Sequence, residues 1–434
     1  MRGEKKTERM DEKKKWLLTA FMCMWCLCLM AQGDSLWTVS GRVVDAKTRK
    51  AMASVSVMAG RVGTVTNADG EFVLKVSGKP REVVFSCLGY LSRRLTAAEC
   101  KNLEQQEQPV RMQASSVMLD EVIVEGREAR DIVLRAISKI EQNYPKKADL
   151  LRGFYRETVQ KRQRFVSIAE GVVDVYKTGY QRGENRDGVA ILKGRRLLSQ
   201  RSSDTLAVKL QGGPVLPIIL DIVKERDILL NADELEKYTL RLKSPEKMDG
   251  RLQYVVELTP RKMDFYALWT GRLYIDRETL AFTKIDLSLD MSDEEKVTSM
   301  ILRKKPFGLR FSPKQLSVTI DYTTDNGVTR MNYIRNEIRF RCDWKRKVFK
   351  SNFIVVSELV VTDRNEGDNV KPIKVRDTFF RQDNFYDKVI YFNDPDFWGT
   401  ENIIEPTEDL LKGIEKIKKL RKREKHGPDT EDNP

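Results

Sequence analysis

The sequence predicts a mainly β protein, with an N-terminal seven-stranded β-sandwich followed by an α+β domain that has a large curved antiparallel sheet and a few helices. Short β-rich segments separated by turn residues occupy residues 38–113, which favours a sandwich of short strands. Longer strand-like segments dominate residues 127–400, and only a few segments there have helical spacing. Helices on one side of a long antiparallel sheet are typical of the α+β class.

The first domain is expected to contain strands at SGRVV, ASVSVMA, GTVT, EFVLKV, EVVFS and SRRLT. In EFVLKV, the residues Phe72, Leu74 and Val76 alternate with Val73 and Lys75, as in a strand with one buried face. Asn67 and Gly70 precede this strand and favour a turn, because Asn bonds its own backbone and Gly accepts positive φ. Strands of this length and number make a sandwich.

This part of the chain also resembles a known family. The pattern GRVVDAKTRKAMASVSVMAGRVGTVTNADGEFVLKV, followed by VVFSCLGY, is similar to the carboxypeptidase regulatory-like domain, a prealbumin-like β-sandwich. The usual Pro-Leu after the first turn is replaced by Ala51-Met52, which affects loop shape rather than the core. The resemblance implies a non-catalytic domain of the kind found beside metallocarboxypeptidases or at the start of TonB-dependent receptors.

Residues 114–126 are expected to form a linker or an edge strand. Their segment MLDEVIVEG is similar to the stretch that follows this domain in TonB-dependent receptors and that resembles the box engaging TonB. About 300 residues follow it, which is too few for the large barrel of such transporters.

The second domain is expected to span residues 127–400. Residues 127–143 have apolar residues at helical spacing and end near Pro145, and VLPIILDIVKERDIL predicts a shorter helix. Strands are expected at LRGFYRETV, RFVSIAEGVVDVYKT, RLQYVVELTP, GRLYIDRETLAFTKIDLSLDM, QLSVTIDYTT and FIVVSELVVTD. In one of them an apolar face is predicted for Leu252, Tyr254, Val256 and Leu258, and an opposite face for Gln253, Val255 and Glu257.

Two stretches of this domain are similar to the outer-membrane lipoprotein carrier family, whose half-open barrel curls around helices and shelters an acyl chain. They are DIVLRAISKIEQNYPKKADLLRGFYRETV and MDGRLQYVVELTPRK with ALWTGRLYIDRETLAFTKIDLSLD, which cover about half of residues 127–340. The resemblance implies an apolar ligand inside the curved sheet, although no lipid-contacting residue can be transferred. If the helices fill the concave face completely, the domain is instead a plain scaffold.

The C-terminal part contains two features with open alternatives. In YFNDPDFWGTENIIEP, the residues Phe397 and Trp398 are expected to pack onto the main domain, with a sugar-binding platform as the alternative. Residues 401–434 are expected to form a basic helix and a disordered tail. The apolar stripe of that helix either docks on its own domain or lies on an anionic membrane, and it comprises Leu410, Leu411, Ile414, Ile417 and Leu420.

Histidine content limits the possible chemistry. The only histidine is His426, in the terminal stretch KKLRKREKHGPDTEDNP, so neither Ser-His-Asp nor Cys-His catalysis nor a common catalytic zinc site can be built from the folded part. There is no phosphate loop, no GxSxG elbow and no paired CxxC cluster outside the N-terminal segment. The sequence therefore predicts no enzyme and no catalytic, cofactor-binding or metal-binding residues, although a carboxylate-based glycan hydrolase stays open.

Export is indicated at the N-terminus. Lys13, Lys14 and Lys15 precede the apolar run WLLTAFMCMWCLCLM, which ends near Ala31, so we expect residues 1–31 to be a signal peptide. An uncleaved anchor is the alternative, but the apolar run is shorter than the roughly 20 residues of a membrane span. Lipid anchoring is disfavoured, because no small residue precedes either cysteine of the CLC motif. The cysteines outside this segment allow at most one disulfide, and they are Cys87, Cys100 and Cys342.

These observations predict an exported, non-catalytic binding or carrier protein of the Gram-negative periplasm or outer membrane, holding a lipid or another apolar ligand. The alternative is a structural or assembly partner of a TonB-linked outer-membrane complex. The net charge of +14 favours anionic partners. No nucleic acid partner is expected, because export would separate the protein from it, and membrane association is expected to be peripheral at most.

Overall fold

The computed structural model describes residues 35–115, 124–125, 127–183, 186–199, 201, 208–210, 212–261, 264–344, 350–367, 370–391 and 396–426. The expected signal peptide and most of the MLDEVIVEG segment lie outside these residues. Within the described part of the chain, no helix has both the length and the apolar character needed to cross a membrane.

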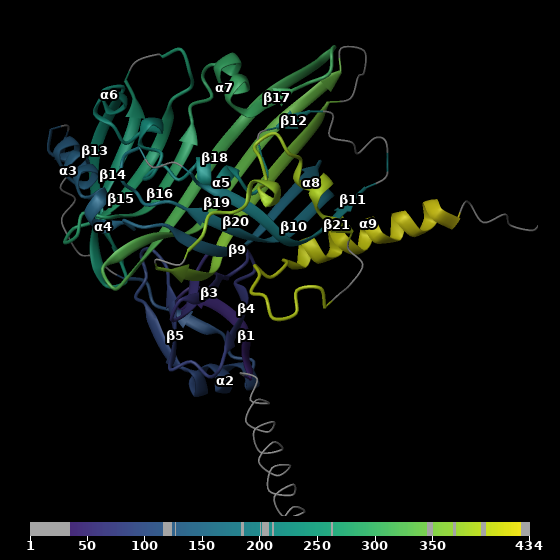
Figure 1. The fold of residues 1–434 in the computed structure, drawn as a ribbon, viewed down its shortest axis with the longest axis horizontal. Helices are drawn as coiled ribbons and strands as arrows, with labels where there is room; N and C mark the ends of the chain where they lie inside the picture. The colour runs from purple at the N-terminus through teal and green to yellow at the C-terminus, as the bar shows by residue number, and fades with distance from the viewer. Residues whose placement is uncertain are drawn as a thin grey trace, which may run out of the picture.

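The N-terminal domain is a seven-stranded sandwich, as predicted (Figure 1). One sheet has the order β4-β1-β7 and the other the order β3-β2-β5-β6. Buried apolar side chains from both sheets meet between them, with the rings of Phe72 and Phe85 in an edge-to-face contact at 5.4 Å. The strands are β1 Leu36–Asp45, β2 Ser56–Ala59, β3 Val62–Val65, β4 Glu71–Ser77, β5 Glu82–Ser86, β6 Arg93–Thr96 and β7 Val110–Met112.

The sandwich also contains a helix that the sequence analysis missed, α2 at Ala97–Gln105. Its N-terminus is a capping box, because the Glu99 N–H donates to Thr96 Oγ1 (3.3 Å) while the Thr96 N–H donates to Glu99 Oε2 (2.7 Å). The Thr-x-x-Glu spacing is a recognised helix-start signal, so the sequence did contain the information. The expected strand SRRLT ends where this cap begins.

The second domain is built on one twelve-stranded sheet with the order β21-β11-β10-β9-β20-β19-β18-β16-β15-β14-β13-β8. Neighbouring strands are antiparallel except at one edge, where the short β21 pairs in parallel with β11. The strands are β8 Val124–Glu125, β9 Asp149–Lys161, β10 Arg164–Lys177, β11 Gly188–Leu198, β13 Tyr238–Met248, β14 Arg251–Pro260, β15 Trp269–Asp276, β16 Phe282–Leu289, β18 Leu309–Asp325, β19 Val328–Trp344, β20 Ser351–Glu366 and β21 Ile390–Tyr391. A separate two-stranded sheet joins β12 Lys209–Leu210 to β17 Leu302–Lys304.

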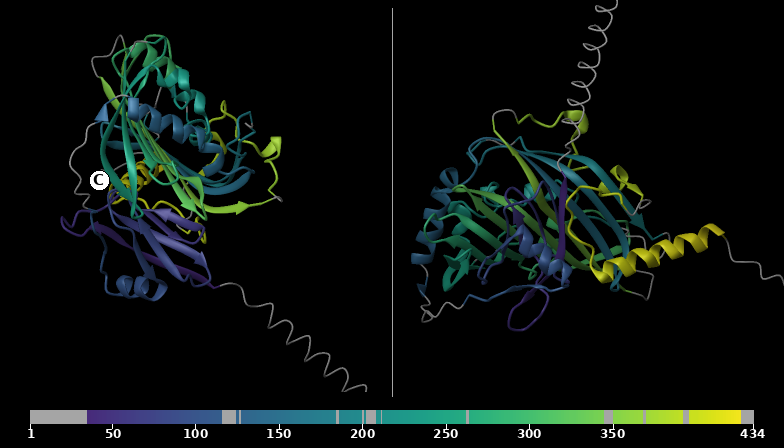
Figure 2. Two further views of the ribbon diagram at one scale, coloured as in Figure 1. Left: turned by 90° about the vertical axis from the view of Figure 1, so that its left-hand side faces the viewer. Right: turned by 90° about the horizontal axis from the view of Figure 1, so that it is seen from below.

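The large sheet is curved, and both of its faces are covered (Figure 2). Helices and irregular segments fill the concave face, where Tyr155, Val173 and Phe282 belong to one continuous apolar core. The sandwich and the C-terminal segment lie on the convex face, where Val65 of β3 packs with Phe154 of β9. The curved antiparallel sheet of the predicted fold class is therefore confirmed.

The helix expected at residues 127–143 is present as two pieces, α3 Arg127–Ser138 and α4 Ile140–Asn143. Its buried side chains, including Val133 and Ile140, face the concave core. The chain leaves the helix at Tyr144, directly before Pro145, because a residue that precedes proline disfavours the helical conformation.

The expectation of a continuous helix over residues 215–229 is wrong. Only α5 Leu216–Ile219 and the 3₁₀ turn η2 Arg226–Ile228 are helical, and turns join them. Asp221 is the physical reason. It is completely buried and bonded to side chains of two distant segments, so the backbone follows this network instead of continuing a helix.

The C-terminal elements pack on the convex face. Trp398 is buried with its ring edge-to-face on Phe154 at 5.3 Å, which confirms the expected packing and not a sugar platform. The helix α9 Glu408–His426 docks on β10 and β11 through three buried side chains, as predicted, and these are Leu410, Ile414 and Ile417. It continues through residues expected to be disordered, up to His426.

The remaining helices are short: α6 Ala232–Leu235, α7 Glu294–Ile301, η3 Val375–Asp377 and α8 Phe385–Lys388. The three cysteines outside the N-terminal segment are free thiols, with Cys87 half-buried and Cys100 and Cys342 buried. No disulfide therefore joins the described parts of the chain.

Candidate functional site

Among the described residues, the deepest part of the concave face, where the sequence analysis places an apolar ligand, is packed with side chains. Side chains of α3, α4 and residues 212–230 fill it, and Val133, Ile140 and Leu229 are fully buried. A cavity of about 10 Å³ remains near β9 and β10, lined by Pro145, Asp149, Leu151, Lys177, Thr178, Tyr180, Arg330 and Met331. This is about the space of one water molecule and far below that of an acyl chain.

A buried ionic network holds this closure in place. The Asp221 carboxylate, with 0% of its side chain exposed, accepts hydrogen bonds from the Tyr180 hydroxyl (2.5 Å) and the Tyr322 hydroxyl (2.7 Å). It also pairs with the Lys177 Nζ at 2.8 Å. Strands β10 and β18 are thereby bonded to the turn after α5, which fixes that turn on the sheet.

The same network extends to a second carboxylate. Asp187 pairs with Lys224, whose ammonium group also donates to the Thr178 carbonyl at 2.8 Å. Burial opposes ionisation of Asp187, but the nearby Lys177 and Lys224 outweigh it and lower the pKa of that carboxyl. The pKa of Lys224 is itself lowered by burial and by the positive charge of Lys177. Such paired charges stabilise a fixed geometry and offer no opening to a substrate.

The other part of the concave face, over β9 to β11, is covered differently. Residues 370–391, which we call the strap, cross it with little regular structure. Three apolar side chains of the strap are buried there, namely Phe379, Phe385 and Val389. The Phe385 ring lies edge-to-face on Tyr155 at 5.0 Å.

Glycines provide the seat for these side chains. Gly171 of β10 and Gly194 of β11 pair directly across the sheet. A Cβ at Gly194 would lie 2.5 Å from Val389 Cγ1, and a Cβ at Gly171 would lie 3.2 Å from the Phe385 ring. Without side chains, the two strands form an apolar depression that the strap fills.

Polar contacts also hold the strap on the sheet. Arg196 donates to the Tyr386 carbonyl and lies 3.7 Å from the Asp387 carboxylate. Beneath the strap, Glu157 accepts hydrogen bonds from the Tyr155 hydroxyl (2.9 Å) and the Gly213 N–H (3.2 Å). Burial raises the pKa of Glu157 and outweighs those two hydrogen bonds. The covered surface therefore combines apolar rings with one carboxyl group whose pKa is raised by burial.

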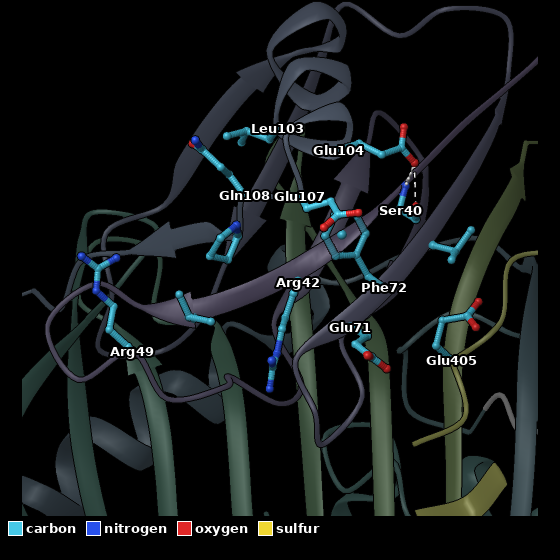
Figure 3. A pocket seen from close by; sticks show the side chains of 14 residues that line it. Ser40, Arg42, Arg49, Glu71, Phe72, Leu103, Glu104, Glu107, Gln108 and Glu405 are labelled. Atoms are coloured by element: carbon cyan, nitrogen blue, oxygen red, sulfur yellow. Dashed lines mark hydrogen bonds between the residues drawn. The ribbon is translucent and has the colours of Figure 1, made fainter. Parts of the chain in front are cut away.

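A second concave region lies outside the large domain, on the sandwich (Figure 3). This hollow of about 640 Å³ is open to solvent and is lined by β1, β4, the end of α2 and one residue of the C-terminal segment. Glu104 accepts from the Ser40 hydroxyl at 2.6 Å, and Phe72 contributes an apolar wall. Its charged side chains have both signs, and they are Arg42, Arg49, Glu71, Glu104, Glu107 and Glu405.

Among the described residues, no group of three or more His, Cys, Asp or Glu side chains is placed to hold a metal ion. The sequence analysis named no catalytic, cofactor-binding or metal-binding residue, and that statement stays a prediction. The sequence analysis also missed the hollow on the sandwich and the glycine-lined depression under the strap, because both are assembled from segments distant in the sequence.

The convex face has a second buried network, which holds the C-terminal segment in place. Glu170 accepts from Arg156 Nε at 2.7 Å and from Arg195 Nε at 2.9 Å. Arg156 also donates to the Ile404 carbonyl at 2.7 Å, and the Arg195 guanidinium lies 4.9 Å from the Trp398 ring centre. The large sheet and the C-terminal segment are thus held together on this side.

The N-terminal sandwich has the strand order and packing described above for residues 36–112. Residues 39–124 match the family model of the CarboxypepD_reg-like domain. The recognition of this domain from sequence is therefore confirmed. The match covers the sandwich and the start of the large sheet, and a search of curated proteins finds no match to the chain.

Solved structures similar to the chain are distant. An assigned outer membrane lipoprotein-sorting protein domain from Vibrio parahaemolyticus is 12% identical, covers 56% of this chain and 95% of its own, and has a TM-score of 0.25. A DUF1329 family protein from Desulfovibrio piger is 12% identical, with 54% and 92% covered and a TM-score of 0.21. An assigned membrane-associated protein of unknown function from Bacteroides fragilis is 10% identical, with 76% and 99% covered and a TM-score of 0.13. TM-scores of this size support no inference about the fold, ligand or site of this chain.

Proposed function

We propose that this chain is an exported, non-catalytic binding protein that takes up an apolar ligand on the concave face of its large sheet when the strap moves away. The supporting observation is the strap itself. Three of its apolar side chains lie in a glycine-lined depression that is continuous with the main core. Removing them would uncover an apolar surface, which an acyl chain could cover with a gain of about 25 cal/mol per Å² buried.

The two parts of the concave cover differ in how they are held. Residues 212–230 are bonded to the sheet by the fully buried network around Asp221. The strap has only short regular elements, namely a three-residue 3₁₀ turn, a four-residue helix and a two-residue edge strand. Its hydrogen bonds to the rest of the domain include Phe379 N–H to the Val189 carbonyl at 2.7 Å, Arg303 to the Arg381 carbonyl at 2.9 Å and Arg196 to the Tyr386 carbonyl. Segments with few buried polar bonds and little regular structure open at lower free energy than the global unfolding. The strap is therefore the part of the cover expected to yield to a ligand.

An engineered, reducible disulfide between the strap and β11 tests this proposal. A Cβ at Gly194 would lie 3.1 Å from Val389 Cβ, so a small outward shift of the strap would bring two cysteines there to the separation of about 3.5–4.5 Å found in disulfides. We expect Gly194→Cys with Val389→Cys to block binding of a fluorescent fatty acid in the oxidised protein and to restore it on reduction. Probe binding that is equal in both states, or absent from the unmodified protein, would contradict uptake under the strap.

The compartment belongs to the same proposal. Lys13 to Lys15, the apolar run after them and Ala31 favour export to the periplasm or outer membrane with loss of residues 1–31. N-terminal sequencing of the exported protein should find Gln32 first. Retention of Met1 would contradict processing without affecting the strap proposal.

A second candidate is an assembly partner of a TonB-linked outer-membrane complex, and the open hollow on the sandwich favours it. Its mixed charges and apolar wall suit a polar partner surface rather than a lipid. Photo-cross-linking groups placed at Arg49 and Glu107 in producing cells should then give one discrete protein adduct. The matched control position is Arg81, an exposed sandwich residue outside the hollow. Equal labelling from the control would remove support for this candidate.

A further inference from the structure

One loop of the large domain presents an uncovered aromatic side chain on a fixed turn. Phe307 is fully exposed, at 101% of its reference area. The Leu309 N–H donates to the Pro306 carbonyl at 3.3 Å, and Gly308 has a φ of 79°. This is the arrangement of a type II turn, in which glycine accepts the positive φ at the third position. The ring is therefore held outward by the backbone and is not a frayed end.

The same stretch is strongly basic. Between Leu302 and Lys314 there are five basic residues and no acidic one. All five side chains are exposed, and they are Arg303, Lys304, Lys305, Arg310 and Lys314. We call residues 302–314 the basic loop. A cluster of this density attracts an anionic surface by about 1 kcal/mol for each Lys or Arg that comes close.

The position of the basic loop leaves it accessible to a large, flat partner. The strand β17, which leads into the turn, lies toward the upper edge of the large sheet in Figure 1, and the sandwich lies at the opposite, lower end. The basic loop is joined to the strap, because Arg303 Nη1 donates to the Arg381 carbonyl at 2.9 Å. A flat partner could reach the basic loop without meeting the sandwich.

The geometry points to the basic loop as a docking site for an anionic phospholipid bilayer surface. An aromatic ring beside a group of cations matches the interface, where the ring enters the boundary between headgroups and acyl chains and the cations contact the headgroups. This inference does not depend on uptake of a ligand under the strap. It places the strap beside the bilayer if both hold.

The chain offers a matched control for the aromatic side chain. Phe265 is also highly exposed, at 85%, on a loop at the start of β15. Its neighbour Asp264 pairs with Lys237 at 2.7 Å, and Glu234 pairs with the same lysine at 2.8 Å. Phe265 therefore has acidic groups beside it as well as the basic Arg261 and Lys237, whereas the basic loop contains no acidic residue. If cations decide where the protein docks, Phe265 should matter much less than Phe307.

Vesicle co-sedimentation of the exported, processed protein tests the inference. We expect binding to vesicles of phosphatidylcholine with phosphatidylglycerol, little binding to phosphatidylcholine alone, and weakening by salt. Phe307→Ser should weaken binding roughly tenfold, and Lys304→Ala with Lys305→Ala should weaken it roughly thirtyfold. Phe265→Ser should change it less than about twofold.

Several results would overturn the inference. These are no binding of the unmodified protein to phosphatidylglycerol vesicles, equal binding to neutral vesicles, or equal losses for the Phe265 and Phe307 variants. Self-association in gel filtration that Phe307→Ser abolishes would assign the basic loop to a second copy of the chain instead. Circular dichroism of each variant checks that the fold is unchanged.

Discussion

Asn402 pairs with the backbone of Lys75 as though it were another strand: its Oδ1 accepts the Lys75 N–H, and its Nδ2 donates to the Lys75 carbonyl, both at 2.8 Å. The two residues are 327 positions apart in the sequence. The contact covers the free edge of β4 with the C-terminal segment, so that edge is not left open for pairing with another chain.

Asn402→Ala should destabilise the protein by about 1–3 kcal/mol, because two backbone groups of Lys75 lose their partner near the sandwich edge. Denaturant unfolding measures the change. Asn352→Ala is the control, because Asn352 is exposed, and it should stay within about 0.5 kcal/mol of the unmodified protein. Equal effects of the two substitutions would mean that the pairing contributes nothing.

The network around Asp221 leads to a larger expected effect. Asp221→Ala leaves the 4%-exposed Lys177 without its closest carboxylate and should cost about 3–5 kcal/mol of unfolding free energy. Tyr322→Phe removes a single hydrogen bond to Asp221 and should cost about 1–2 kcal/mol, which keeps the test usable if the first variant does not fold.

The control for this network is an exposed ion pair. Lys412 lies 2.6 Å from Glu408 on α9, with most of both side chains exposed. Lys412→Ala should change the free energy of unfolding by less than about 0.5 kcal/mol. If Asp221→Ala costs no more than this, the network is not what fixes residues 212–230 on the sheet.

The sandwich is expected to fold alone. Its core cluster draws only on residues 39–112, and β1 begins at Leu36, two residues before the predicted start of the domain. A fragment of residues 35–115 should give a β-type circular dichroism spectrum, unfold cooperatively and show no hydrolytic activity. Its stability should be lower than in the whole chain, because Thr64 loses the Ile403 carbonyl and Val65 loses its cover. A helical or unfolded spectrum would contradict the proposed boundary.

Local patterns of apolar residues in the sequence predicted most of the strands and helices of the fold. Alternation in EFVLKV and in RLQYVVELTP marked β4 and β14 correctly, and the apolar spacing before Pro145 marked α3 and α4. The segment containing Asp221 misled the same reasoning, since its apolar residues have helical spacing while its carboxylate bonds to Tyr180 and Tyr322, 41 and 101 positions away. Such long-range polar bonds leave no periodic signal.

The glycine-lined depression under the strap could not be predicted from the sequence, for a related reason. A glycine in a strand signals a bulge or a close approach of another segment, but not which segment approaches. Gly171 and Gly194 become a depression only when β10 and β11 pair in this register, and Phe385 reaches it from about 190 residues further along the chain.

Glu157 should make closure of the strap depend on pH. Burial raises the pKa of this carboxyl when the strap is closed, and opening returns it toward its ordinary value near 4.5. A raised pKa in the closed state means that closure is most stable at pH values below the ordinary pKa and weakens as the pH rises through the raised pKa.

Hydrogen exchange of the α8 amides, corrected for intrinsic rates, should therefore show protection that falls as pH increases from about 4.5. Glu157→Gln keeps the hydrogen-bonding shape without the ionisation and should flatten this dependence, whereas Glu408→Gln, an exposed carboxyl on α9, should leave it unchanged. The same slope in the Glu157→Gln variant would show that another group controls the strap.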